Sequence, residues 1–85
     1  MEEGKFYLFA CPWYWTFIGR YAGVVDFQHI AIEDAIYFTR TGATFDVLCS
    51  KGLQKESVIA GPFERLVIPS QGPKFPYHGK VSWVK

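Results

Sequence analysis

The sequence has few cysteines and no long uncharged run. Only Cys11 and Cys49 are cysteines, and they lack the Cys-x-x-Cys spacing of a metal or redox site. The longest uncharged stretch, Phe6 to Gly19, contains Pro12 and is shorter than the roughly 20 apolar residues that a membrane-spanning helix needs. We therefore expect free thiols, with a single disulfide as the alternative, and no membrane partner.

Charge is also scarce. Charged residues make up 20% of the chain and the formal net charge is +1, whereas nucleic-acid-binding domains are usually more basic. The chain opens Met1-Glu2-Glu3-Gly4, and this acidic start does not fit a secretory signal, which begins with basic residues. The sequence therefore predicts a cytoplasmic protein.

The sequence lacks the residue patterns of catalysis. His29 and His78 lie far apart in the chain, and neither has a nearby metal-ligand partner. Glu33 and Asp34 are adjacent, but neighbours on a strand point to opposite faces and cannot readily share a proton or a metal. No phosphate-binding glycine motif is present. We expect no enzymatic activity, no cofactor and no metal site.

What the chain has in plenty is apolar surface. Its 85 residues are 49% hydrophobic and 19% aromatic, enough for one small domain spanning residues 1–85. Residues 1–39 carry two basic and five acidic side chains, whereas residues 40–85 carry seven and three. This asymmetry favours contact between the two regions of different copies, or between a basic face and phosphates.

Residues with high β-propensity dominate the first half of the sequence. They predict strands over Lys5–Cys11, Tyr14–Val25 and His29–Thr39, with Gly19 and Gly23 on one face of the second strand, as in a strand that bends sharply. Asp34 interrupts the apolar alternation of the third strand. It must be hydrogen-bonded, lie beyond a bulge or face an interface, since an unpaired buried carboxylate costs several kcal/mol.

The second half is less regular. We expect a short helix or structured loop over Ala43–Gly52, an irregular connection over Leu53–Pro62, and a strand over Glu64–Ile68 that Pro69 ends. A turn-rich loop over Gln71–Pro76 would then lead to a last strand over Gly79–Val84. The prediction is an all-β fold of five strands with one short helical or loop insertion, and at this length a small barrel is its natural closure.

The stretch "GRYAGVVDFQHIAIEDA" from Gly19 to Ala35 resembles the first motif of Sm-like proteins, in which a glycine in a bent second strand leads to a loop aspartate and a third strand. With the terminal "KVSWV", the pattern is similar to small Sm-like proteins of phage or marine metagenomic origin. The usual asparagine is replaced by Gln28 or His29, and the Arg-Gly of the second motif is missing around Gly72.

The resemblance implies an SH3-like barrel that assembles edge to edge into a cyclic homo-oligomer and binds single-stranded RNA or a nucleotide-sized ligand near the pore. For a phage-encoded protein the location would be the host cytoplasm. Phe27 or His29 would stack a base, and Arg20 or Lys74 would neutralise phosphate. The implied binding residues are Arg20, Asp26, Phe27, Gln28, His29, Gln71 and Lys74.

Structural roles compete with each of these assignments. His29 would then cap backbone groups, Phe27 would close the end of the barrel, and Arg20 would pair with Asp34 or Glu33. The aromatic cluster Trp13-Tyr14-Trp15 would lie in the core, at an interface or on a binding surface. The alternative function is a structural or protein-interaction module, also of phage type, with no nucleic-acid partner.

Overall fold

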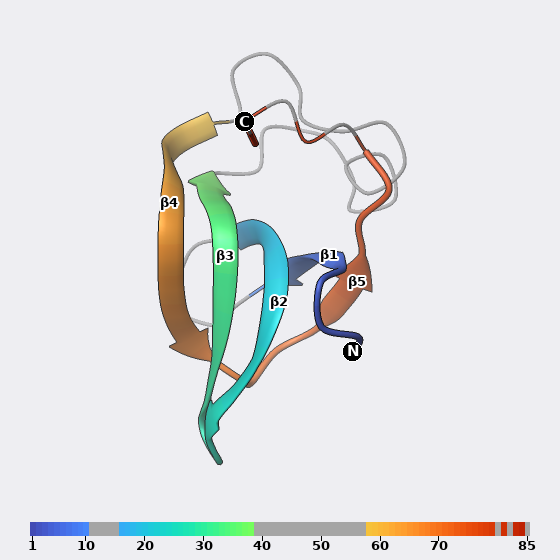
Figure 1. Ribbon diagram of the computed structural model, residues 1–85, viewed down its shortest axis with the longest axis vertical. Coiled ribbons are helices and arrows are strands. Elements are labelled where there is room, and N and C mark those ends of the chain that lie inside the picture. Colours follow the sequence, from blue (N-terminus) through green and yellow to red (C-terminus); the bar gives the residue numbers. More distant parts are fainter. Residues whose placement is uncertain (11–15, 39–57, 80, 82, 85) are drawn as a thin grey trace.

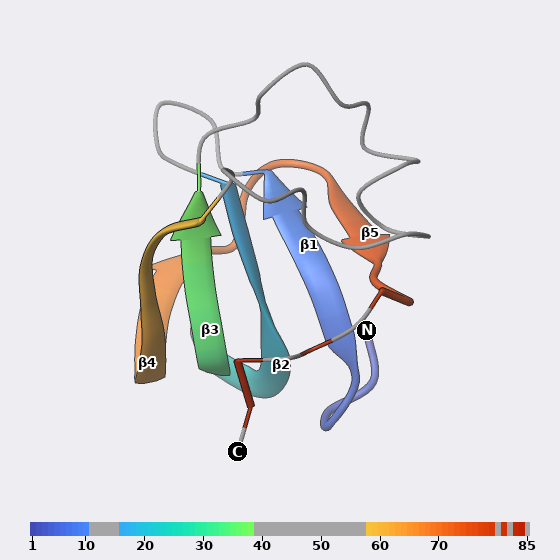
Figure 2. The same ribbon diagram turned by 90° about the horizontal axis from the view of Figure 1, so that it is seen from above.

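The fold is a single antiparallel sheet of five strands, seen in a computed structural model that describes residues 1–10, 16–38, 58–79, 81, 83 and 84. The strands are β1 (Phe6–Ala10), β2 (Thr16–Asp26), β3 (His29–Phe38), β4 (Val58–Pro69) and β5 (Lys74–Pro76). Their order across the sheet is β4-β3-β2-β1-β5, and β2 curves strongly (Figures 1 and 2). The all-β prediction is confirmed.

The first three predicted strands are confirmed to within about two residues, but the last two predictions need correction. The fourth strand begins at Val58 rather than Glu64, so its first part replaces the end of the expected irregular connection. The last strand is Lys74–Pro76, inside the expected loop, whereas Gly79, Val81 and Val84 are not in a strand. Pairing with β1 and β3 thus overrides the local turn chemistry of the prolines and glycines.

Several features of the sequence prediction lie outside the described residues. They are the helix or loop over Ala43–Gly52, the cluster Trp13-Tyr14-Trp15, and the two cysteines Cys11 and Cys49. Among the described residues there is no helix of the length and apolar character that crossing a membrane requires.

A β-bulge at Asp34 explains how this carboxylate interrupts an apolar strand. Ile18 pairs with Ile36 and Arg20 pairs with Glu33, so two residues of β3 face the single residue Gly19. Asp34 has a φ of 48°, a conformation that aspartate tolerates better than most residues. The expected bulge is therefore present, and Nη1 of Arg20, 2.5 Å from Oδ2 of Asp34, provides the expected polar partner.

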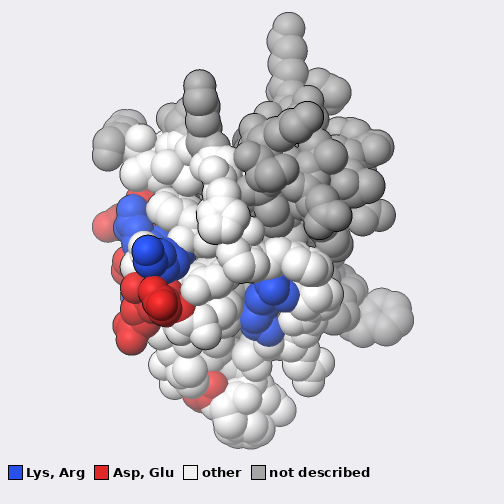
Figure 3. Space-filling model, turned by 90° about the vertical axis from the view of Figure 1, so that its right-hand side faces the viewer, with Lys and Arg blue, Asp and Glu red and all other residues white. Residues whose placement is uncertain are grey.

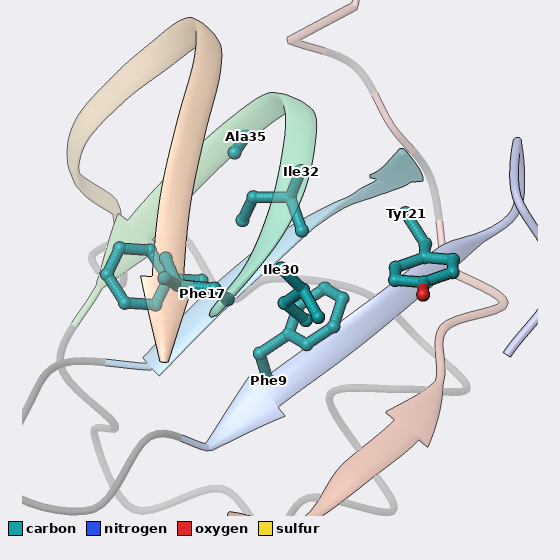
Figure 4. Close-up of a cluster of buried hydrophobic side chains, with 7 residues drawn as sticks. Phe9, Phe17, Tyr21, Ile30, Ile32 and Ala35 are labelled. Carbon is teal, nitrogen blue, oxygen red and sulfur yellow. The ribbon is translucent and has the colours of Figure 1, made fainter. Parts of the chain in front are cut away.

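The bulge also distributes apolar side chains over two clusters, because one extra residue reverses the faces of the strand that follows. One cluster takes Ile32 and Ala35 with Phe9 and Phe17, and Figure 4 shows these side chains gathered between β1, β2 and β3. The other takes Ile36 with Leu8, Ile18 and Tyr77. Strands β2 and β3 are thus buried on both faces near the bulge.

Candidate binding site at the β2–β3 turn

The turn between β2 and β3 is short and internally bonded. Asp26 pairs with His29 across the two strands, which leaves Phe27 and Gln28 as the connecting residues. Oδ1 of Asp26 accepts a hydrogen bond of 2.8 Å from the backbone N–H of Gln28, an arrangement that aspartate commonly forms in turns. The turn is the lowest point of Figure 1 and projects beyond the rest of the sheet.

The same carboxylate orients His29. Nδ1 of His29 lies 3.0 Å from Oδ1 of Asp26, and the imidazole is partly exposed. The backbone N–H of Gln28, followed by the His29 side chain, holds the pKa of Asp26 below its ordinary value of 3.8. Asp26 is therefore ionised at neutral pH, and its bond to Nδ1 leaves Nε2 of His29 as the ring nitrogen for a ligand.

Apolar side chains surround this polar pair. The Phe27 side chain is 89% exposed, and Val24, on the approach to the turn, is 70% exposed. Val25, directly before Asp26, is also exposed. Asp26 is the only charged residue between Tyr21 and Ile32, and the lower end of the molecule in Figure 3 is uncharged apart from one small acidic area. The exposed ring suits a planar or apolar partner.

The segment between β4 and β5 lies against the β2–β3 turn. The backbone N–H of Ser70 donates to the carbonyl oxygen of Gln28 at 2.8 Å. Lys74 also holds this segment, since its Nζ donates to the carbonyls of Ser70 and Gly72. Gln71, between these two carbonyls, is exposed. Four of the implied binding residues thus lie in the turn, with Gln71 and Lys74 in the segment beside it.

Arg20 is separate from this group. Its Nη1 lies 2.5 Å from Oδ2 of Asp34, and its guanidinium carbon lies 5.2 Å from the centre of the Phe6 ring. Asp34 lies in the bulge of β3 and Phe6 pairs with Arg20 from β1, whereas Arg20 itself is six positions before Asp26 in β2. Arg20 therefore has the structural role that was the alternative to phosphate binding.

Sequence reasoning missed two parts of this surface. The bond from Ser70 to Gln28 depends on the register of β3 against β4, in which His29 pairs with Pro69, and no local pattern signals it. The run Val24-Val25 before Phe27 was a usable signal, because neighbouring residues of a strand point to opposite faces and both valines precede a turn residue that is itself apolar.

The turn combines an aromatic face with side-chain amide and imidazole groups, which can stack a planar ring and bond its edge. Within the described residues, no group of three or more His, Cys, Asp or Glu side chains could hold a metal ion. Comparisons with models of protein families, with curated proteins and with solved structures give no match.

Proposed function

We propose that this chain is a ring-forming, Sm-like binding protein that takes the bases of single-stranded RNA at the β2–β3 turn. The observation that carries the proposal is the hydrogen bond from Ser70 to Gln28, which joins the turn to the segment containing Gln71. Two loops far apart in the sequence thus offer one surface, with Phe27 exposed beside it.

The chemistry of the turn favours bases over phosphates. The Phe27 ring stacks a base, while Gln28 and Nε2 of His29 bond its edge. Lys74 and Arg20, the two expected phosphate ligands, already bond backbone carbonyls and Asp34. Binding therefore depends on stacking, and its salt dependence is shallow because few phosphates are neutralised.

The two outer strands of the described sheet support the assembly into a ring. In the described part of the sheet, β4 pairs only with β3, and β5 pairs only with β1. The outermost strand of a sheet can pair with a strand of another molecule, and pairing β4 of one copy with β5 of the next would continue the sheet from copy to copy. Repeated head-to-tail contacts of this kind close into a ring when the rotation between copies permits.

A second candidate, a protein-interaction module, is favoured by the exposed valines beside Phe27. An apolar tip with no basic side chain suits an apolar pocket of a protein as well as it suits a base. The two candidates differ in what they require of residue 27, because a base needs a flat ring whereas a pocket needs apolar volume.

The test measures oligomer mass by light scattering and affinity for oligouridylate and oligoadenylate by fluorescence anisotropy. Phe27→Leu keeps apolar volume without a π face, and Val67→Ala is the control, an apolar truncation outside the turn. Stacking by Phe27 predicts that Phe27→Leu weakens RNA binding about 5- to 100-fold and that Val67→Ala leaves it nearly unchanged. The mass should be that of a closed ring in every variant.

Equal RNA binding by the wild-type and Phe27→Leu proteins would contradict base stacking at the turn. A mass of one subunit at all concentrations would contradict the ring. A ring that binds neither oligonucleotide would support the second candidate, for which Phe27→Leu is expected to retain partner binding.

A further inference from the structure

A groove opens at the opposite end of β2 and β3 from the turn. Its volume is about 460 Å³, within the range of small-molecule and side-chain pockets. Pro62 and Val84 form part of its wall, and none of the residues from Asp26 to His29 lines it. The side chains that give it chemical character are Arg20, Asp34, Phe63, Glu64 and Trp83.

The polar floor of the groove is fixed by two contacts to Asp34. The indole Nε1–H of Trp83 donates to the backbone carbonyl of Asp34 at 2.7 Å. Nη1 of Arg20 bonds Oδ2 of the same residue. Because Asp34 has a positive φ in the bulge, these contacts hold a conformation that would otherwise be unfavourable. Such a residue, held in an uncommon conformation, often marks a functional site.

The described residues that line the groove carry an excess of negative charge. Arg20 and Asp34 neutralise each other, whereas Glu64 is exposed and makes no ion pair within the described part of the chain. Oδ1 of Asp34 also makes no hydrogen bond there, since both contacts of this residue use other atoms. Two carboxylate groups can therefore accept hydrogen bonds from a cationic ligand.

Aromatic rings complete a site for a flat cation. One face of Phe63 stacks on Tyr37, with 6.0 Å between ring centres and 7° between planes, and Phe63 lines the groove. Trp83 packs edge to face against Phe6 and is anchored through Nε1. Indole is the aromatic side chain that attracts cations most strongly.

We propose that this groove binds an arginine side chain of a protein partner. A guanidinium matches it because the planar group stacks on aromatic rings while its N–H groups bond carboxylates in a fork. An anionic ligand would face Glu64 and the free oxygen of Asp34. This inference is independent of RNA binding at the turn, because the two sites share no residue.

The experiment follows the Trp83 indole N–H by NMR, with Trp83→Phe to assign its signal. The probes are the blocked tripeptide Gly-Arg-Gly, the same peptide with lysine, the same peptide with neutral citrulline, and free agmatine. The arginine peptide should shift the signal with a dissociation constant on the order of 1 mM, the lysine peptide should bind more weakly, and citrulline should give no shift.

Glu64→Gln should weaken arginine-peptide binding about 2- to 5-fold, whereas Glu3→Gln, the same charge change at an exposed residue outside the groove, should have no effect. Equal weakening by both variants would overturn the proposal in favour of general charge attraction. An equal shift with the citrulline peptide, no shift with any peptide, or tighter binding of agmatine than of the arginine peptide would also overturn it.

Discussion

The two ends of the β2–β3 pair differ sharply in how they use their residues. At the bulge end, Gly19 of β2 and Gly61 of β4 both pack closely against Ala35 of β3. A Cβ added to either glycine would lie within 3.0 Å of an atom of Ala35. At the turn end, Val24 and Phe27 stand in solvent. The same two strands thus contain positions at which close packing dictates the residue and positions at which packing does not explain an exposed apolar side chain.

The largest expected effect is at Gly61, where a side chain would disrupt the close packing of the bulge end. Gly61 has a φ of 124°, and a Cβ there would lie 2.8 Å from Cγ2 of Ile36 and 2.9 Å from the carbonyl oxygen of Ala35. Gly61→Ala should therefore lower the free energy of unfolding by about 3 kcal/mol or more, from strain and overpacking together. Denaturant titration measures this loss.

Gly4→Ala is the matched control for Gly61. Gly4 also has a positive φ, 87°, but no atom lies within 4 Å of the added Cβ. Its substitution should cost only the conformational term, about 1 kcal/mol. Equal losses for the two variants would mean that Gly61 is not in a crowded position.

The next effect is at Gly19, where only crowding acts. A Cβ would lie 3.0 Å from Cβ of Ala35 and 3.1 Å from Cδ1 of Ile32. Gly19→Ala should cost about 1–3 kcal/mol. Adding Ile32→Val removes the clashing Cδ1, so the double variant should lose less stability than the sum of the single variants. Additive losses would show that Ile32 does not set the limit at this site.

The sequence allowed good prediction of β1 to β3, but the start of β4 and the position of β5 were predicted wrongly. The alternation of aromatic and β-branched residues in these strands is a local signal. Asp34 interrupts this alternation, and the interruption indicated a bulge as one explanation. The early part of β4 was missed because Gly61 and Pro62 resemble loop residues. Strand β5 was misplaced because its three residues include Pro76 and form only against β1, a non-local pairing.

The candidate site divides in the same way. The turn over Asp26–His29 was predictable, because its hydrogen bonds join residues that are neighbours in the chain. The engagement of Lys74 with backbone carbonyls and of Arg20 with Asp34 was less predictable. Sequence spacing alone does not say which of several acceptors a long cationic side chain reaches.

A smaller effect should separate two features of Asp34 at the bulge end, its charge and its tolerance of a positive φ. Asp34→Asn keeps a short polar side chain that tolerates a positive φ but removes the charge facing Arg20. It should cost up to about 1 kcal/mol, because the ion pair is partly exposed to solvent. Asp34→Ala removes both features and should cost about 1–2 kcal/mol. Thermal unfolding compares the variants, and equal losses would assign the whole effect to the ion pair.

The smallest effect is expected at the turn end, where the exposed carboxylate of Asp26 orders the turn. Because its pKa is lowered in the folded protein, the ionised form stabilises the turn above pH 3.8, and this contribution is lost as the pH falls through the lowered pKa. The amide N–H of Gln28, followed by NMR, should therefore titrate with a midpoint below 3.8.

Asp26→Asn is the matched control, because its amide oxygen still accepts the bond from Gln28 but does not titrate in acid. The Gln28 signal of this variant should stay constant over the range in which the wild-type signal moves, and the amide of Leu8 in β1 should stay constant in both proteins. A wild-type midpoint at or above 3.8 would mean that the carboxylate does not order the turn. The turn end would then lack the preorganisation that distinguishes a binding turn from a merely exposed one.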